Sequence, residues 1–417
     1  MTITQEPTFP NGTQADLIYV INGVYASSPQ HKYVCRLSTA GETLSTIKQV
    51  SNQFGYGVFE VSRLLDDHMG YDVDMKISGS SPYARSTNNN IGEFEIAFAE
   101  EYGSSPSSSI VTTPYISGSV SGSQQVIPAV VEKDAGYFNW QSGSYDALTN
   151  APNIVTVVNS DTILDSLIVS SSDYATLSTL NNVYDDKVFN YIDILFYNAS
   201  LALQATLSTT VSNIPGDDIS GKLVHIGVGP KNLRGVTGID TYLDDPAQYP
   251  YYAIRLRYTD DTGFPQSDLH LYNNTSNCYK GTNFAFINKL GVMDYYRATL
   301  VDTQMEKFNR ETYKAPYINY STMAGTIDYD STRRGTTQYY ASFENDFTAE
   351  TNWLTQEYAD YLFELFESPS VYVQQGDQWV GAVLTNGSEQ YKTNPKGQKI
   401  FKFTIQYRLS NSKHSRY

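Results

Sequence analysis

A strict alternation of apolar and polar residues is the feature of this sequence that most constrains its fold. Near the C-terminus, apolar residues occupy every second position from Phe401 to Leu409, with Lys402, Thr404, Gln406 and Arg408 between them. Shorter stretches at residues 93–98 and 254–258 repeat the pattern. Successive side chains of a strand point to opposite faces, so each of these segments predicts a strand with one dry and one wet face. This pattern is typical of antiparallel sheets in sandwiches and barrels.

Helical patterns are few. The clearest covers residues 356–367, where apolar residues recur at i, i+3, i+4, i+7 and i+8. Thr355 is a suitable N-cap, and Pro369 prevents the helix from continuing. A shorter helix is predicted over residues 61–68, with Leu64, Leu65 and His68 facing inward. The sequence therefore predicts one well-marked helix among many strands.

Clusters of Ser, Gly and Pro mark the expected domain boundaries, for example at residues 103–109 and 117–123. The length of 417 residues suggests roughly three globular units. We expect a mostly β fold, with tandem antiparallel β-sandwich domains followed by a small α+β C-terminal domain. Residues 1–118 are expected to form an immunoglobulin- or fibronectin-like sandwich, and residues 119–187 a Ser/Gly-rich connecting segment with short strands. Residues 188–332 should form a second sandwich, and residues 333–417 an α+β assembly domain with a helix and an antiparallel hairpin.

The charge balance argues against nucleic-acid binding. There are 28 Lys and Arg against 44 Asp and Glu, which gives a net charge of −16. Phosphate backbones should repel such a chain, so we expect no sequence-specific nucleic-acid partner. No apolar run approaches the ~20 residues that span a bilayer, and the N-terminus lacks the basic and apolar regions of a secretory signal. We therefore expect a soluble product of the cytoplasm with no membrane partner.

Cysteine, histidine and glycine motifs give no sign of catalysis. Cys35 and Cys278 are expected to be isolated buried thiols, although a single long-range disulfide remains an alternative. The five histidines form no H-E-x-x-H pair, there is no G-x-S-x-G motif, and the glycines at residues 227–229 lack the lysine of a phosphate loop. We therefore expect no enzyme, no cofactor and no metal-ligand set. A calcium ion at one of the acidic turns stays open, as does a glycosidase whose two carboxylates are brought together by the fold.

Tyrosine is unusually abundant, with 35 residues against 18 Phe. Three explanations stand side by side. Tyr is enriched at protein interfaces, because it offers a large contact area and a polar tip. Exposed aromatic rings also stack on sugars. The plainest explanation is that Tyr fills strand positions, where its propensity is high.

Three stretches of the sequence resemble structural proteins of tailed-bacteriophage virions. They are residues 54–65, residues 284–296, and residues 368–373 with the flanking helix, strand and hairpin pattern. The resemblance is one of pattern and carries no catalytic motif. It implies a non-enzymatic structural component of a bacteriophage virion, forming an oligomeric ring or adaptor in the tail, baseplate or neck. Its implied partners are copies of itself in a ring and other virion tail or neck proteins, and its implied location is the virion, after synthesis in the host cytoplasm. A glycan- or receptor-binding adhesin of a phage tail is the alternative.

Two strand segments of the C-terminal unit are candidates for subunit contact. A ring needs complementary patches on every copy. The final strand, from Ile400 to Leu409, and the hairpin from Val371 to Leu384 are able to continue a sheet into a neighbouring subunit. Pairing within the chain alone is the equal alternative. The candidate interface residues, for contact or core roles, are Tyr372, Trp379, Phe401 and Tyr407.

Overall fold

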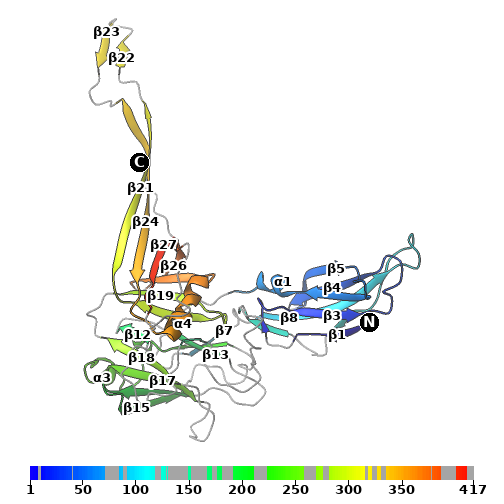
Figure 1. Ribbon diagram of the computed structural model, residues 1–417, viewed down its shortest axis with the longest axis horizontal. Helices are drawn as coiled ribbons and strands as arrows, with labels where there is room; N and C mark the ends of the chain where they lie inside the picture. The colour runs from blue at the N-terminus through cyan, green and yellow to red at the C-terminus, as the bar shows by residue number, and fades with distance from the viewer. Residues whose placement is uncertain are drawn as a thin grey trace, which may run out of the picture. The chain divides into compact units, whose positions relative to one another are not determined.

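The computed structural model confirms a mostly β fold with few helices (Figure 1). The structure describes residues 1–7, 11–39, 41–70, 84–87, 92–117, 124–127, 129, 149–151, 167–170, 176–180, 191–210, 223–257, 269–275, 281–314, 318–321, 326–329, 335–376, 378–386 and 401–410. Cys278, most of the expected connecting segment 119–187 and Ile400 of the expected final strand lie outside these residues. In the described parts of the chain, no helix reaches the length and hydropathy needed to cross a bilayer.

Two facing sheets form the N-terminal part. One has the strand order β1-β3-β6, and the other has the order β2-β11-β8-β4-β5, with β9 and β10 also paired to β8. Strand β11 follows residue 118 in the sequence, yet it pairs with β8 in this second sheet. The bounds are β1 (Thr2–Gln5), β2 (Asn11–Gly12), β3 (Ile18–Asn22), β4 (Lys32–Thr39), β5 (Glu42–Gln49), β6 (Tyr56–Glu60), β8 (Gly92–Tyr102), β9 (Val111–Thr112), β10 (Ile116–Ser117) and β11 (Gln124–Ile127).

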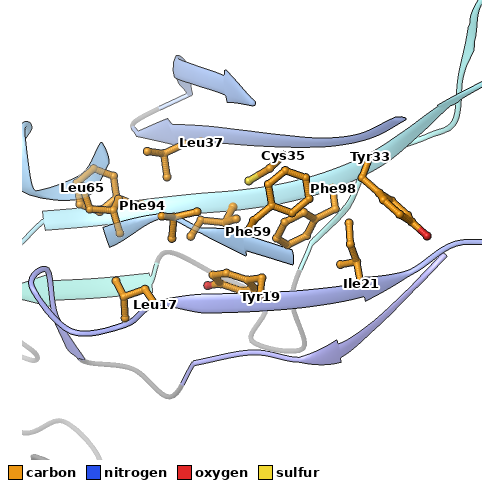
Figure 2. Packing of buried hydrophobic residues seen from close by; sticks show 12 residues of the cluster. Leu17, Tyr19, Ile21, Tyr33, Cys35, Leu37, Phe59, Leu65, Phe94 and Phe98 are labelled. Atoms are coloured by element: carbon orange, nitrogen blue, oxygen red, sulfur yellow. The ribbon is translucent and has the colours of Figure 1, made fainter. Parts of the chain in front are cut away.

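The core between these sheets is lined with large apolar side chains (Figure 2). The predicted strand at residues 93–98 is part of β8, and its three alternating apolar residues Phe94, Ile96 and Phe98 are buried. The ring of Phe98 lies 5.2 Å from that of Tyr19 on the opposite sheet. Cys35 is a free, buried thiol in this core, and burial raises its pKa to about 12. The Cys35 side chain therefore acts as a small apolar group.

The short helix predicted over residues 61–68 is present as α1 (Ser62–Asp66). Leu65 is fully buried in the same core and Leu64 packs against it, as expected. His68 is exposed, which corrects the prediction that it faces inward. The helix ends at Asp66, so His68 lies beyond its last turn.

The middle of the chain has two further sheets. Their strand orders are β12-β18-β17-β14-β15 and β13-β16-β7. The predicted strand at residues 254–258 is, up to Arg257, part of β17. The bounds are β7 (Ala84–Thr87), β12 (Leu167–Ser170), β13 (Thr176–Leu180), β14 (Tyr191–Tyr197), β15 (Leu203–Thr210), β16 (Leu223–Gly227), β17 (Tyr251–Arg257) and β18 (His270–Thr275), with helices α2 (Pro230–Leu233) and α3 (Asp240–Leu243).

The face of β17 that was expected to be exposed to solvent is partly buried. Alternation placed Arg257 on the solvent side of β17, but the residue is only 8% exposed. Its guanidinium donates to both carboxylate oxygens of Asp193 on the neighbouring strand, at 3.1 Å each. Arg255 donates to the same carboxylate at 3.1 Å. A buried charge persists only when it is paired, and this cluster provides the pairing.

The C-terminal part contains a seven-stranded sheet with the order β20-β19-β25-β26-β27-β24-β21. The helix predicted over residues 356–367 is confirmed as α4 (Gln356–Glu367). The hairpin predicted from residue 371 to residue 384 is also present, as β25 and β26. The bounds are β19 (Thr282–Ile287), β20 (Met293–Ala298), β21 (Asp302–Lys314), β24 (Thr336–Glu350), β25 (Val371–Gln375), β26 (Gln378–Leu384) and β27 (Thr404–Leu409), and a separate pair is formed by β22 (Ile318–Ser321) and β23 (Thr326–Tyr329).

Candidate functional site

Two long strands, β21 and β24, extend beyond the rest of their sheet (Figure 1). They pair antiparallel from Asp302 opposite Ala349 to Lys314 opposite Thr336, with one irregularity after Glu311. On its other edge, β24 pairs with β27 only over Asp346–Glu350. We call the remaining two-stranded part, residues 306–314 and 336–345, the arm.

The arm is unusually exposed for regular structure. Every one of the 13 residues of β21 is exposed to solvent. The exposed fraction is 61% for Phe308, 49% for Tyr313 and 48% for Tyr339. An isolated two-stranded ribbon is marginally stable in water. Exposed apolar side chains gathered on such a ribbon indicate a contact surface.

One face of the arm continues the buried face of the sheet. Phe308 lies directly opposite Phe343 on the paired strand. Phe347 lies four residues farther along β24 and therefore points to the same face as Phe343. Its ring stacks on Tyr407 of β27, with centroids 5.2 Å apart. On this face the pair of Asn345 and Glu306 separates Phe347 from the Phe308–Phe343 pair, and Phe308 remains largely exposed.

The opposite face of the same strands carries ion pairs. Arg408 of β27 contacts Asp346 at 2.5 Å and Glu344 at 3.1 Å. Lys307 also pairs with Asp346. The hydrogen bonds from Lys307 and Arg408 hold the pKa of the Asp346 carboxyl below its usual value. The face at the root of the arm that carries Lys307 and Asp346 is therefore satisfied by ion pairs. On the other face, the Phe308 ring remains exposed between the charged side chains of Glu306 and Arg310.

The four candidate interface residues lie at different places in the C-terminal part. Tyr407 is 3% exposed and packs between Phe284 and Phe347, and burial raises its pKa to about 12. Phe401 is 5% exposed and forms an isolated bridge with Leu354. Tyr372 and Trp379 are partly exposed, and the strand register places both on the face of the sheet that carries Arg408. Tyr407 contacts Phe347, which lies next to the arm on β24.

A second feature that the sequence did not reveal is a pair of buried carboxyl groups. Asp294 of β20 accepts hydrogen bonds from Thr149 at 2.8 Å and from Asn288 at 3.0 Å. Glu364 of α4 accepts from Asn150 at 2.6 Å and from the backbone N–H of Lys289 at 3.0 Å. Both residues are 5% exposed. Burial raises the pKa of both carboxyls, that of Asp294 to about 7.

This carboxyl pair fits a structural role. Its hydrogen bonds tie α4 and residues 149–150 to the turn between β19 and β20. A glycosidase needs its two carboxyls on either side of an accessible sugar bond, and these side chains are almost completely covered by protein. Within the described ranges, no group of three or more His, Cys, Asp or Glu is placed to hold a metal ion. The arm is therefore the candidate functional site.

Comparison with known proteins adds no assignment. No protein-family model matches this sequence, and no curated protein matches it either.

Proposed function

We propose that this chain is a non-enzymatic structural subunit that assembles into an oligomer through its arm. The assembly that the sequence resemblance implies is a ring or adaptor in the tail, baseplate or neck of a bacteriophage virion. In this proposal the chain acts with copies of itself and with other virion proteins. The arm supplies the subunit contact, and the body of the sheet anchors it.

One observation carries this proposal: the Phe308 ring of the arm has no cover in the described chain. Phe308 is 61% exposed although it lies opposite another Phe and in line with a buried core. Burying such a ring contributes about 1.5–3 kcal/mol. A two-stranded ribbon is itself only marginally stable, so an exposed Phe ring on it loses this stabilisation unless a partner covers the ring. A structural subunit meets that partner during assembly.

The adhesin alternative has weaker support. A glycan-binding site gathers aromatic rings around one pocket, beside acidic or amide groups. The exposed rings of Phe308, Tyr313 and Tyr339 instead follow a two-stranded ribbon. This linear arrangement is suited to contact with another protein chain.

A shortened arm tests the proposal. Residues 309–342 are replaced by the dipeptide Asn-Gly, which closes the ribbon at the Phe308–Phe343 pair with a favoured hairpin turn. Negative-stain images and the solution mass of the shortened chain are compared with those of the intact chain. We expect oligomers of the intact chain and single copies of the shortened one. Oligomers of equal size from both chains would contradict the proposal, as would a monomeric intact chain that binds a glycan array through the same residues.

A further inference from the structure

We propose that the partner of the arm is the arm of a second copy, with β21 of each chain paired antiparallel about Phe308. This inference deepens the proposed function and rests on it. The contact is two-fold symmetric, so the same residues of both copies take part. Any ring built from such pairs contains an even number of chains.

The position of β21 in the sheet makes this pairing available. Among the described strands, β21 is last in the order of its sheet, so one backbone edge faces no other strand. The strand is 13 residues long and contains neither Gly nor Pro. Native proteins usually protect an edge of this kind by shortening, bulging or covering it. The irregularity in the ladder lies after Glu311, beyond the centre of the strand.

The charge sequence of β21 is complementary to itself in one symmetric register. When Phe308 lies opposite Phe308 of the second copy, Glu306 lies opposite Arg310. In the same register Asp302 lies opposite Lys314. Because the contact is symmetric, each of these pairs occurs twice. No position of β21 then faces a like charge.

Neighbouring registers fit less well. In an antiparallel pair, residues that lie opposite each other point to the same face of the sheet. A two-fold symmetric pairing is therefore allowed only when one residue of β21 lies opposite the same residue of the other copy. Centring on Lys307 places two ammonium groups opposite each other. Centring on Asn309 offers one complementary pair, Lys307 with Glu311. Both of these side chains already have partners within the chain, Asp346 and Tyr339 respectively.

Phe308 supplies the apolar centre of the proposed contact. Even-numbered residues of β21 lie on the face that carries Phe308, so the two Phe308 rings and the flanking ion pairs lie on one side of the joined sheet. Arg310 already lies 5.6 Å from the Phe308 ring of its own chain. In the proposed pair the same guanidinium also meets Glu306 of the other copy. The four rings of Phe308 and Phe343 from both chains then form one cluster.

Cysteine cross-linking tests the register in the full chain. Directly opposite residues of an antiparallel pair have Cβ atoms about 4.5–5.5 Å apart, close to the range of a disulfide. Phe308→Cys is therefore expected to form a covalent dimer under mild oxidation. Glu306→Cys and Arg310→Cys are each expected to stay uncross-linked alone and to form a heterodimer when mixed. The unsubstituted chain controls for its own thiols, of which Cys35 is buried.

Charge reversal provides an independent readout. Glu306→Arg places two guanidinium groups opposite each other at both symmetric positions, and Arg310→Glu does the same with carboxylates. Each is expected to raise the dissociation constant of the dimer about tenfold. The double variant Glu306→Arg/Arg310→Glu restores both pairs and is expected to return the constant to that of the parent chain.

The outcomes separate this inference from the proposed function. A chain that stays monomeric at all concentrations would contradict both. An oligomer that ignores the charge reversals and gives no Phe308→Cys dimer would overturn the β21 pairing and leave arm-mediated assembly with another partner surface. Cross-linking of Lys307→Cys or Asn309→Cys alone in preference to Phe308→Cys would overturn the register.

Discussion

Phe347 of β24 and Tyr407 of β27 stack with their ring centroids 5.2 Å apart and their planes 16° from parallel. This contact marks the point where the covered part of the sheet ends and the arm begins. On the same face, beyond the pair of Asn345 and Glu306, Phe343 lies opposite Phe308, which is 61% exposed. The face of β24 that contributes Phe347 to the core therefore also carries the exposed Phe308–Phe343 pair of the arm.

Tyr407→Ala should destabilise the C-terminal part. The ring is 3% exposed and lies between Phe284 and Phe347, so its removal leaves a cavity. We expect the free energy of unfolding to fall by about 3–5 kcal/mol in chemical denaturation. Tyr372→Ala is the matched control, because that side chain is partly exposed on the other face. Equal losses in the two variants would contradict the assignment of Tyr407 to the core.

Phe308→Ser should weaken assembly and leave folding intact. The side chain is largely exposed in the single chain, so we expect the unfolding free energy to change by no more than about 0.5 kcal/mol. The dissociation constant of the oligomer, measured by sedimentation, should be higher than that of the parent chain. Phe54→Ser is the control, since Phe54 is 74% exposed and far from the arm in sequence. A Phe54 variant that weakens assembly as much would argue for general surface hydrophobicity as the cause.

Asp294 should make stability depend on pH. Burial raises its folded pKa from the usual 3.8 to about 7, so the folded state favours the protonated form. This contribution to stability is complete below about pH 4 and is lost as the pH rises towards 7. The expected slope is up to about 1.4 kcal/mol per pH unit in that window. Asp294→Asn should remove this part of the slope in denaturation curves taken between pH 4 and 8. An unchanged slope would show that the carboxyl is not buried as described.

Much of the fold could be predicted from the sequence, because most of its strands and helices bury one face. Residues 356–367 have a helical apolar period, and α4 has those bounds. The strands around Phe94 and Tyr407 were predicted in the same way, because apolar residues at every second position mark the face of the strand that is buried.

The arm could not be found by that route. Strand β21 is exposed along its whole length, so no buried face imposes a period of two on its sequence. The only available signals were two long runs without Gly or Pro, at residues 302–314 and 336–350. The Asp294 and Glu364 cluster was missed for another reason. Its members come from distant segments, and only the folded chain brings them together.

Asp193→Ala should lower the free energy of unfolding strongly, whereas breaking an exposed ion pair should change it little. Asp193 is 2% exposed and accepts hydrogen bonds from Arg255 and Arg257, so the variant leaves a buried guanidinium without its anion. We expect a loss of about 3 kcal/mol in unfolding free energy. The side chain of Asp240, which pairs with Arg234, is 61% exposed. Asp240→Ala should therefore lower the unfolding free energy by less than about 1 kcal/mol.

The pH dependence of the Asp193 cluster should have the opposite sign to that of Asp294. Burial alone raises the pKa of Asp193, but the hydrogen bonds from Arg257 and Ser208 outweigh it and lower the pKa below its usual value of 3.8. The stabilisation is therefore present above about pH 4 and is lost as the pH falls. The stabilities of the parent chain and of Asp193→Ala should draw closer together as the pH falls below about 4. A difference in stability that does not shrink on acidification would contradict the ionised pair.

The mass of the intact chain in solution, measured by light scattering over a range of concentrations, tests the central claim most directly. The account predicts an even multiple of the 46.6 kDa chain, falling towards that mass on dilution. A constant mass of 46.6 kDa at every concentration would contradict assembly through the arm.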